Sequence, residues 1–246
     1  MLETHTCQGA AHAGYARAGW DTLGVDIAAR HLAWNPGPTV RLDAVTAIRQ
    51  VGHHFHAAHT SPPCQWYTRG NAPRRGTDTR WERSIPPVRE ALEATGRPFV
   101  IENVKDAVWD LRDPVMLCGC MFNLTATDDD GTTLHLRRPR LFELGGWDVP
   151  GLVEQKIEHR GQKFLVRSPR YCDHPAGVQV AGVYGGARRD KAEARNVRRG
   201  GYVPPSKDVA AALLGVTHPM TWEGLYECVP PAFTEWIGSR LLEVLA

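Results

Sequence analysis

The chain lacks any hydrophobic run long enough to cross a membrane. No apolar stretch approaches the roughly 18 residues that a helix needs to span a bilayer. Residues 1–5 contain neither the basic region nor the apolar region of a secretory signal peptide. We therefore expect a soluble protein of a reducing compartment, in which the six cysteines are mostly free thiols.

A structural zinc signature is also missing. Cys118 and Cys120 are separated by one residue, and His174 follows two positions after Cys172. Neither pair has the cysteine and histidine spacing that marks a structural zinc site. The sequence therefore predicts no metal ligands.

Short apolar segments alternate with helix-like segments through the first hundred of the 246 residues. Residues 23–27 and 40–44 look like strand ends that carry Asp26 and Asp43, and helices are expected near 13–19 and 45–51. This alternation predicts an α/β fold with a parallel sheet. In doubly wound nucleotide-binding folds an acid at such a strand end binds a ribose. An aspartate there equally caps the next helix, so both roles of Asp26 stay open.

A rigid loop follows the strand-like segment 55–59. Pro62 and Pro63 fix φ and remove two backbone donors, so the chain leaves regular structure and presents Cys64 on a loop. A reactive group just beyond the carboxyl end of a strand lies where open α/β sheets place their chemistry. The alternative is a small, buried and inert thiol, which is the more frequent role of a single cysteine.

Further charged groups lie beside apolar segments. Glu102 and Asn103 follow the apolar run 99–101, and a carboxylate there is either a partly desolvated functional acid or a helix cap. Arg138 and Arg140 alternate in an extended segment, so their guanidinium groups would project from one face and converge on one anion.

Basic residues are concentrated in two places although the net charge is only +2. Residues 188–199 carry six basic and two acidic side chains, and residues 69–83 carry five basic and two acidic ones. Each cluster is either a solvated face or part of a surface for a polyanion. Because one of them follows directly on the Cys64 loop, the pair suggests that a polyanion approaches that loop.

The composition divides the chain into three parts. Residues 1–144 form the expected core, and residues 145–199, rich in Gly, Arg and polar side chains, form a small irregular region. Residues 200–246 return to order, with helices expected at 206–214 and 232–245; the second has an apolar stripe that includes Phe233.

Taken in order, these features resemble the DNA (cytosine-5) methyltransferase family, especially its compact phage and prophage members. The matching stretches are Ser61-Pro62-Pro63-Cys64-Gln65, Glu102-Asn103-Val104, Arg138-Pro139-Arg140, Val25-Asp26 with Asp43, and the segment 227–235. The resemblance covers nearly the whole chain. It implies a Rossmann-like class I methyltransferase fold with a short target-recognition insertion at 145–199 and a C-terminal segment that folds back onto the core.

The resemblance also implies a function. Cys64 would be the nucleophile that adds to C6 of a flipped cytosine, Glu102 the acid at N3, and Asn103 the residue that orders the loop. Arg138 and Arg140 would hold the phosphate or the base O2. The partner of this monomer would be double-stranded DNA, which Gln65, Arg69, Arg188 and Arg189 would contact. The protein would act in the cytoplasm of a bacterium or a phage-infected host cell.

S-adenosylmethionine is the implied donor, but the first cofactor motif departs from the family pattern. The implied contacts are His5, Thr6, Gly9, Ala10, Asp26, Ile27, Asp43, Ala44, Pro62, Phe233 and Thr234. Of the glycines in the family's first turn only Gly9 survives. A second interpretation therefore keeps the cytosine chemistry with a modified S-adenosylmethionine or a methylene-folate as the donor. A third is a DNA-binding relative that has lost catalysis.

Overall fold

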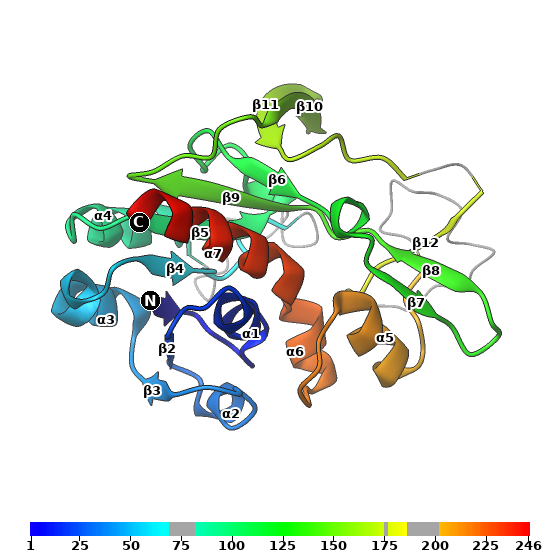
Figure 1. Cartoon of the computed structure of the whole chain (residues 1–246), viewed down its shortest axis with the longest axis horizontal. Coiled ribbons are helices and arrows are strands. Elements are labelled where there is room, and N and C mark those ends of the chain that lie inside the picture. The colour runs from blue at the N-terminus through cyan, green and yellow to red at the C-terminus, as the bar shows by residue number, and fades with distance from the viewer. Residues whose placement is uncertain (69–81, 175–176, 186–201) are drawn as a thin grey trace.

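A nine-stranded sheet forms the centre of the computed structural model, which describes residues 1–68, 82–174, 177–185 and 202–246 (Figure 1). The strand order is β10-β11-β6-β9-β5-β4-β1-β2-β3. Five neighbouring strands run parallel: β3 (Thr39–Arg41), β2 (Leu23–Asp26), β1 (Leu2–Thr4), β4 (Ala58–Thr60) and β5 (Phe99–Val104). The sequence-based prediction of a parallel α/β sheet is confirmed.

Beyond β5 one strand is reversed. β9 (Arg140–Gly145) pairs antiparallel with β5 on one side and with β6 (Val115–Leu117) on the other, so that β6 again runs parallel to β5. The order β3-β2-β1-β4-β5-β9-β6 with this reversed strand is that of the predicted Rossmann-like class I methyltransferase fold. The hairpin of β10 (Val153–His159) and β11 (Gln162–Ser168) extends the same sheet through β6.

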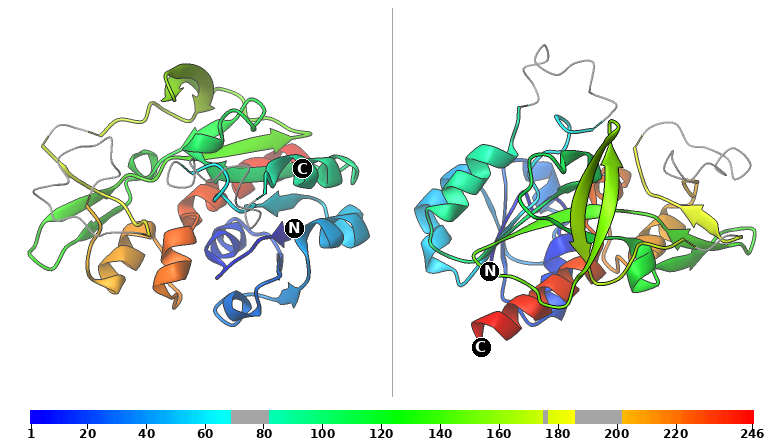
Figure 2. Two further views of the ribbon diagram at one scale, coloured as in Figure 1. Left: turned by 180° about the vertical axis from the view of Figure 1, so that it is seen from behind. Right: turned by 90° about the horizontal axis from the view of Figure 1, so that it is seen from above.

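Helices cover both faces of the sheet (Figure 2). α3 (Ala44–Val51) and α4 (Ile85–Glu93) bury their apolar sides in one core cluster. α1 (Ala10–Arg17) and α7 (Pro231–Leu245) contribute to the cluster on the other face. α7 lies against α1 so closely that a Cβ at Gly14 would stand 2.1 Å from the carbonyl oxygen of Pro231. The C-terminal helix therefore folds back onto the first helix of the core.

A second sheet of three strands forms a smaller layer beside the first. It consists of β7 (Thr125–Thr127), β8 (Thr133–Leu136) and β12 (Gln179–Ala181), in the order β12-β8-β7. α5 (Lys207–Leu214) and α6 (Trp222–Glu227) share a separate core cluster with β8 and β12. The remaining elements are α2 (Ala29–Leu32) and the 3-10 turns η1 (Gly52–His54), η3 (Lys105–Ala107) and η4 (Gly119–Phe122). The domain boundaries at 144/145 and 199/200 stay predictions.

In the described part of the chain no helix is long and apolar enough to span a membrane.

Candidate active site

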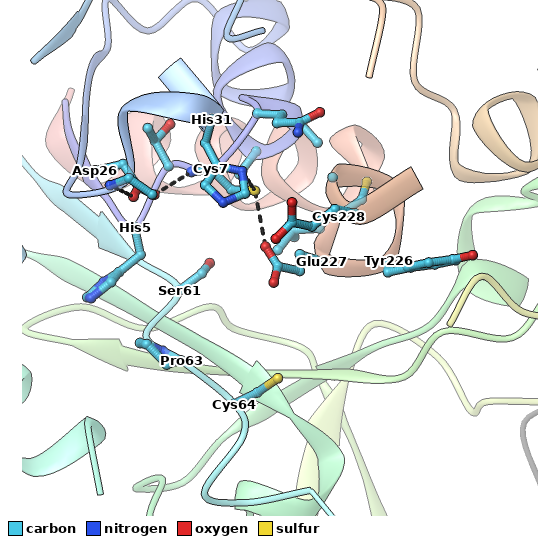
Figure 3. Close-up of a pocket in the computed structure, with 18 of the residues that line it drawn as sticks. His5, Cys7, Asp26, His31, Ser61, Pro63, Cys64, Tyr226, Glu227 and Cys228 are labelled. Atoms are coloured by element: carbon cyan, nitrogen blue, oxygen red, sulfur yellow. Dashed lines mark hydrogen bonds between the residues drawn. The ribbon is translucent and has the colours of Figure 1, made fainter. Parts of the chain in front are cut away.

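A cavity of about 500 Å³ opens at the carboxyl ends of the parallel strands, the edge where open α/β sheets bind ligands. Its walls come from the segments that follow β1, β2 and β4, from the end of β5, from the first residue of β9 and from α6 with the residues after it. Figure 3 shows Cys64 on one side of this cavity and Cys7, His31 and Glu227 on the opposite side.

The Pro-Pro loop holds Cys64 at the cavity. Asn103 donates a hydrogen bond from Nδ2 to the carbonyl oxygen of Pro62 at 2.9 Å. The hydroxyl of Ser84 donates a hydrogen bond to the carbonyl oxygen of Pro63 at 3.0 Å. The chain turns directly after the thiol, because the backbone N–H of Tyr67 donates to the carbonyl oxygen of Cys64 at 2.9 Å. Cys64 is half-buried and lines the cavity.

Glu102 and Arg140 form an ion pair on the same cavity. Arg140 Nε lies 3.1 Å from Glu102 Oε1, and both residues are less than a tenth exposed. The short turn after β5 has no side-chain cap, so Glu102 is not the helix cap that the sequence left open. Burial raises the pKa of the Glu102 carboxyl, and Arg140 opposes this rise. An acid in this position stays protonated to higher pH than an exposed one.

The Cys64 thiol is affected by the same pair. Burial raises its pKa, the Arg140 guanidinium lowers it, and the Glu102 charge raises it again. Protonation of Glu102 removes the negative charge that opposes the effect of Arg140 on the thiol. The Cys64 thiolate is therefore favoured when Glu102 is protonated. The arrangement provides a nucleophile, a carboxyl acid and a fixed positive charge in one cavity.

Arg138 does not have the predicted role. Its side chain is fully buried, and its guanidinium donates hydrogen bonds to the carbonyl oxygens of Tyr226, Cys228 and Val183. It does not line the cavity and does not converge with Arg140 on an anion. The physical reason is that β9 begins at Arg140, so the alternation of side chains along a strand does not extend back to residue 138.

The turn after β1 and the end of β2 form the wall opposite Cys64. His5 and Cys7 adopt positive φ angles of 54° and 48°. Asp26 accepts hydrogen bonds from the backbone N–H groups of Cys7 at 3.0 Å and of Ala28 at 2.8 Å. Asp26 thus braces the turn and also lines the cavity, while Ile27 lines it with 64% of its surface exposed.

The structure separates the eleven predicted cofactor contacts into two groups. Those that line the cavity are His5, Thr6, Ala10, Asp26, Ile27 and Pro62; those that do not are Gly9, Asp43, Ala44, Phe233 and Thr234. Asp43 caps α3 by accepting from the backbone N–H of Thr46 at 2.8 Å. Gly9 precedes α1 at φ 81° and faces Asn35 and Pro36, since a Cβ on it would meet both within 2.7 Å.

The two C-terminal predictions fail because α7 turns these side chains into the core. Phe233 is fully buried between Phe122 and Phe142, and the Thr234 hydroxyl donates to the carbonyl oxygen of Ala11 at 2.9 Å. They pack α7 onto the sheet and α1. The apolar stripe of the sequence had indicated this role for Phe233.

Three cavity residues that were not among the predicted contacts form one polar group. Cys7 Sγ lies 3.4 Å from His31 Nδ1 and donates to Glu227 Oε2 at 3.3 Å. These three donors lie close enough to hold one cation. Burial and the Glu227 charge raise the pKa of the Cys7 thiol, which therefore keeps its proton and satisfies the carboxylate by hydrogen bonding. Cys7 stands in the altered turn and Glu227 begins the matching segment 227–235, and these were the available signals. His31 comes from a short helix without one.

Among the predicted DNA contacts only Gln65 is described, and it lines the cavity. Arg69, Arg188 and Arg189 lie outside the described residues.

Neither a family model nor a curated protein matches the sequence. Among solved structures, the chain is similar to the glycopeptide N-methyltransferase MtfA complexed with S-adenosyl-L-homocysteine, with a TM-score of 0.30 and 14% identity. The match covers 68% of this chain. It covers 65% of the N-methyltransferase chain, which is slightly less than two thirds of that protein's length. A likeness at this level does not assign a function.

Proposed function

We propose that the chain is a DNA cytosine-C5 methyltransferase that uses Cys64 as its nucleophile. The observation that carries the proposal is that Cys64 and the buried Glu102–Arg140 pair line one cavity at the carboxyl ends of β4 and β5. A flipped cytosine needs these groups together, because C5 becomes nucleophilic only after a thiolate has added to C6.

The residues fit the steps of this reaction. The Cys64 thiolate forms a bond to C6 while protonated Glu102 donates a hydrogen bond at N3, so that the electron pair moves to C5. C5 would then form a bond to the donated carbon as the bond between that carbon and the donor breaks and its electron pair stays with the donor. The C5 proton leaves to a base, and loss of the Cys64 sulfur from C6 restores the aromatic ring. The Arg140 guanidinium favours the thiolate of Cys64. The target base must leave the duplex, since its C5 and C6 are stacked there.

S-adenosylmethionine fits the opposite wall. The exposed Ile27 offers an apolar surface beside the carboxylate of Asp26, as at the strand end of nucleoside-binding folds. The N-terminus of α1 has no side-chain cap and Ala10 lines the cavity, so backbone N–H groups are available for a carboxylate. When bound there, the sulfonium compound would supply the methyl carbon.

The polar group of Cys7, His31 and Glu227 supports a second candidate, the same chemistry with a modified donor. A plain methyl group needs no polar partner, whereas a substituted one-carbon unit would be recognised by such side chains. Modified S-adenosylmethionine and methylene-folate are the donors to compare.

One experiment separates these functions. Amplified DNA with unmodified bases is incubated with the protein and each donor, digested to nucleosides and analysed by mass spectrometry, with donor affinity measured by calorimetry. We expect 5-methylcytosine from S-adenosylmethionine. Another C5 substituent would establish the second candidate. Unmodified DNA with every donor, together with retained DNA binding, would instead identify a non-catalytic DNA-binding protein.

We predict that Glu102→Gln changes the shape of the pH profile of kcat/KM for DNA. Transfer needs a Cys64 thiolate and a protonated Glu102, whose pKa values both lie above their ordinary values of 9.0 and 4.5. Between the two pKa values the thiolate fraction rises with pH while the protonated Glu102 fraction falls, so the wild-type profile is flat. In the glutamine variant only the thiolate titrates, and activity rises about tenfold per pH unit.

The absolute rate of this variant should fall about 10²- to 10⁴-fold, the contribution of general acid catalysis. Glu158→Gln is the matched control, because Glu158 is an exposed residue of β10 away from the cavity. Its profile should stay flat. A flat profile in Glu102→Gln would show that Glu102 does not supply the proton.

A further inference from the structure

Four side chains of metal-ligating type converge at the carboxyl end of β6, outside the cavity lining. Cys118 follows β6 directly and Cys120 lies in η4, whereas Cys172 and His174 belong to the segment between β11 and β12. Their four ligand atoms all lie within 4.8 Å of one another, and none of these residues lines the active-site cavity. More than fifty residues separate Cys120 from Cys172, so the four ligands do not form a recognisable zinc motif in the sequence.

The distances between these atoms match a tetrahedral zinc site. Zn–S bonds of about 2.3 Å and Zn–N bonds of about 2.0–2.1 Å place two sulfurs about 3.8 Å apart and a sulfur about 3.6 Å from a nitrogen. Cys120 Sγ and Cys172 Sγ are 3.5 Å apart, and Cys118 Sγ lies 3.6 Å from His174 Nε2. All six cysteines are free, so a disulfide does not explain the approach of Cys120 and Cys172.

Hydrogen bonds tie the segment after β11 both to η4 and to β10 near the four ligands. Arg170 donates from Nη2 to the carbonyl oxygen of Cys120, and the backbone N–H of Cys172 donates to Gln155 Oε1 at 3.4 Å. The same segment follows β11, which pairs with β6 at Arg167 and Val115. These contacts bring the segment after β11 beside the end of β6, where the four ligand atoms meet.

We propose that Cys118, Cys120, Cys172 and His174 bind one structural zinc ion, which fastens the segment after β11 to the end of β6. Three thiolates and one imidazole in a tetrahedral arrangement are typical of zinc. A site with four protein ligands leaves no open position for a substrate, so the ion supports the fold and takes no part in transfer. Its place suggests that it anchors the hairpin β10–β11 and the chain that continues to β12.

The proposal is tested by metal analysis of the purified wild-type protein. We expect about one zinc per chain by mass spectrometry of the metal, and replacement by Co²⁺ should give the visible and thiolate charge-transfer absorption of tetrahedral cobalt. Cys172→Ser and His174→Ala should each lower zinc occupancy at least tenfold after dialysis against a weak chelator, as expected for loss of one ligand. Removal of the ion should lower the thermal unfolding temperature.

Two control variants keep the result specific. Cys228→Ser removes a buried thiol outside the cluster and should keep one zinc per chain. Cys7→Ser should also keep it, and loss of zinc there would place the metal with His31 and Glu227 instead. The proposal would be overturned if the wild-type protein contained no metal and the thiols of Cys118, Cys120 and Cys172 reacted freely with a thiol reagent. A disulfide between Cys120 and Cys172 would also overturn it. So would the absorption of an iron–sulfur cluster.

Discussion

Replacing Cys64 by serine should abolish transfer of the one-carbon unit and leave DNA affinity within a few-fold of the wild-type value. The substitution exchanges sulfur for oxygen in a nearly unchanged shape, but a hydroxyl is far less acidic than a thiol and adds poorly to C6 of cytosine. DNA affinity comes mainly from phosphate contacts, which this side chain does not make. Product formation is measured by nucleoside mass spectrometry and affinity by fluorescence anisotropy at one stated salt concentration.

A covalent trap identifies the attacking sulfur directly. DNA in which cytosine is partly replaced by 5-fluorocytosine cannot lose a proton from C5, so the bond between Cys64 and C6 should persist through a denaturing gel. Cys7 and Cys228 also line the cavity and serve as matched controls. Cys7→Ser and Cys228→Ser should still form the complex, whereas Cys64→Ser should not. Normal turnover in Cys64→Ser would refute the assignment.

The sequence predicted the sheet well because local signals marked its strands. Apolar segments separated by helix-like stretches lie close to the observed β2, β4 and β5, and Pro62 with Pro63 ended regular structure where the loop is observed. The carboxyl ends of parallel strands share one edge. Placing Cys64, Glu102 and Asp26 at strand ends was therefore enough to bring them to one cavity.

Other features depend on contacts between distant segments, which local patterns do not encode. α6 is only six residues long, and Gln8 holds its start through hydrogen bonds with Thr221 at 2.8 Å. Glu227 lies at the other end of this helix and lines the cavity. The two halves of the cysteine–histidine cluster meet because β6 and β11 pair, and nothing near Cys118 in the sequence indicates that strand pairing.

Arg138→Met should destabilise the fold by about 3–5 kcal/mol, the range for removing one member of a buried charged network. Its guanidinium joins three carbonyl oxygens, one within α6, one just after α6 and one in the segment after β12. Methionine leaves all three buried without that donor. Each unsatisfied buried acceptor costs about 1–3 kcal/mol. The free energy of unfolding is measured by urea denaturation followed by circular dichroism.

Arg137→Met provides the matched control, because this neighbour is only half-buried and no described hydrogen bond or ion pair involves its guanidinium. It should change the free energy of unfolding by less than about 0.5 kcal/mol, as surface substitutions do. A lysine at position 138 cannot supply the planar fork of donors and should recover only part of the loss. If Arg138→Met unfolded like the wild type but bound DNA weakly, Arg138 would contact phosphate after all. The expected outcome, low stability with DNA affinity preserved under folding conditions, assigns the anion-facing role in the Arg-Pro-Arg segment to Arg140 alone.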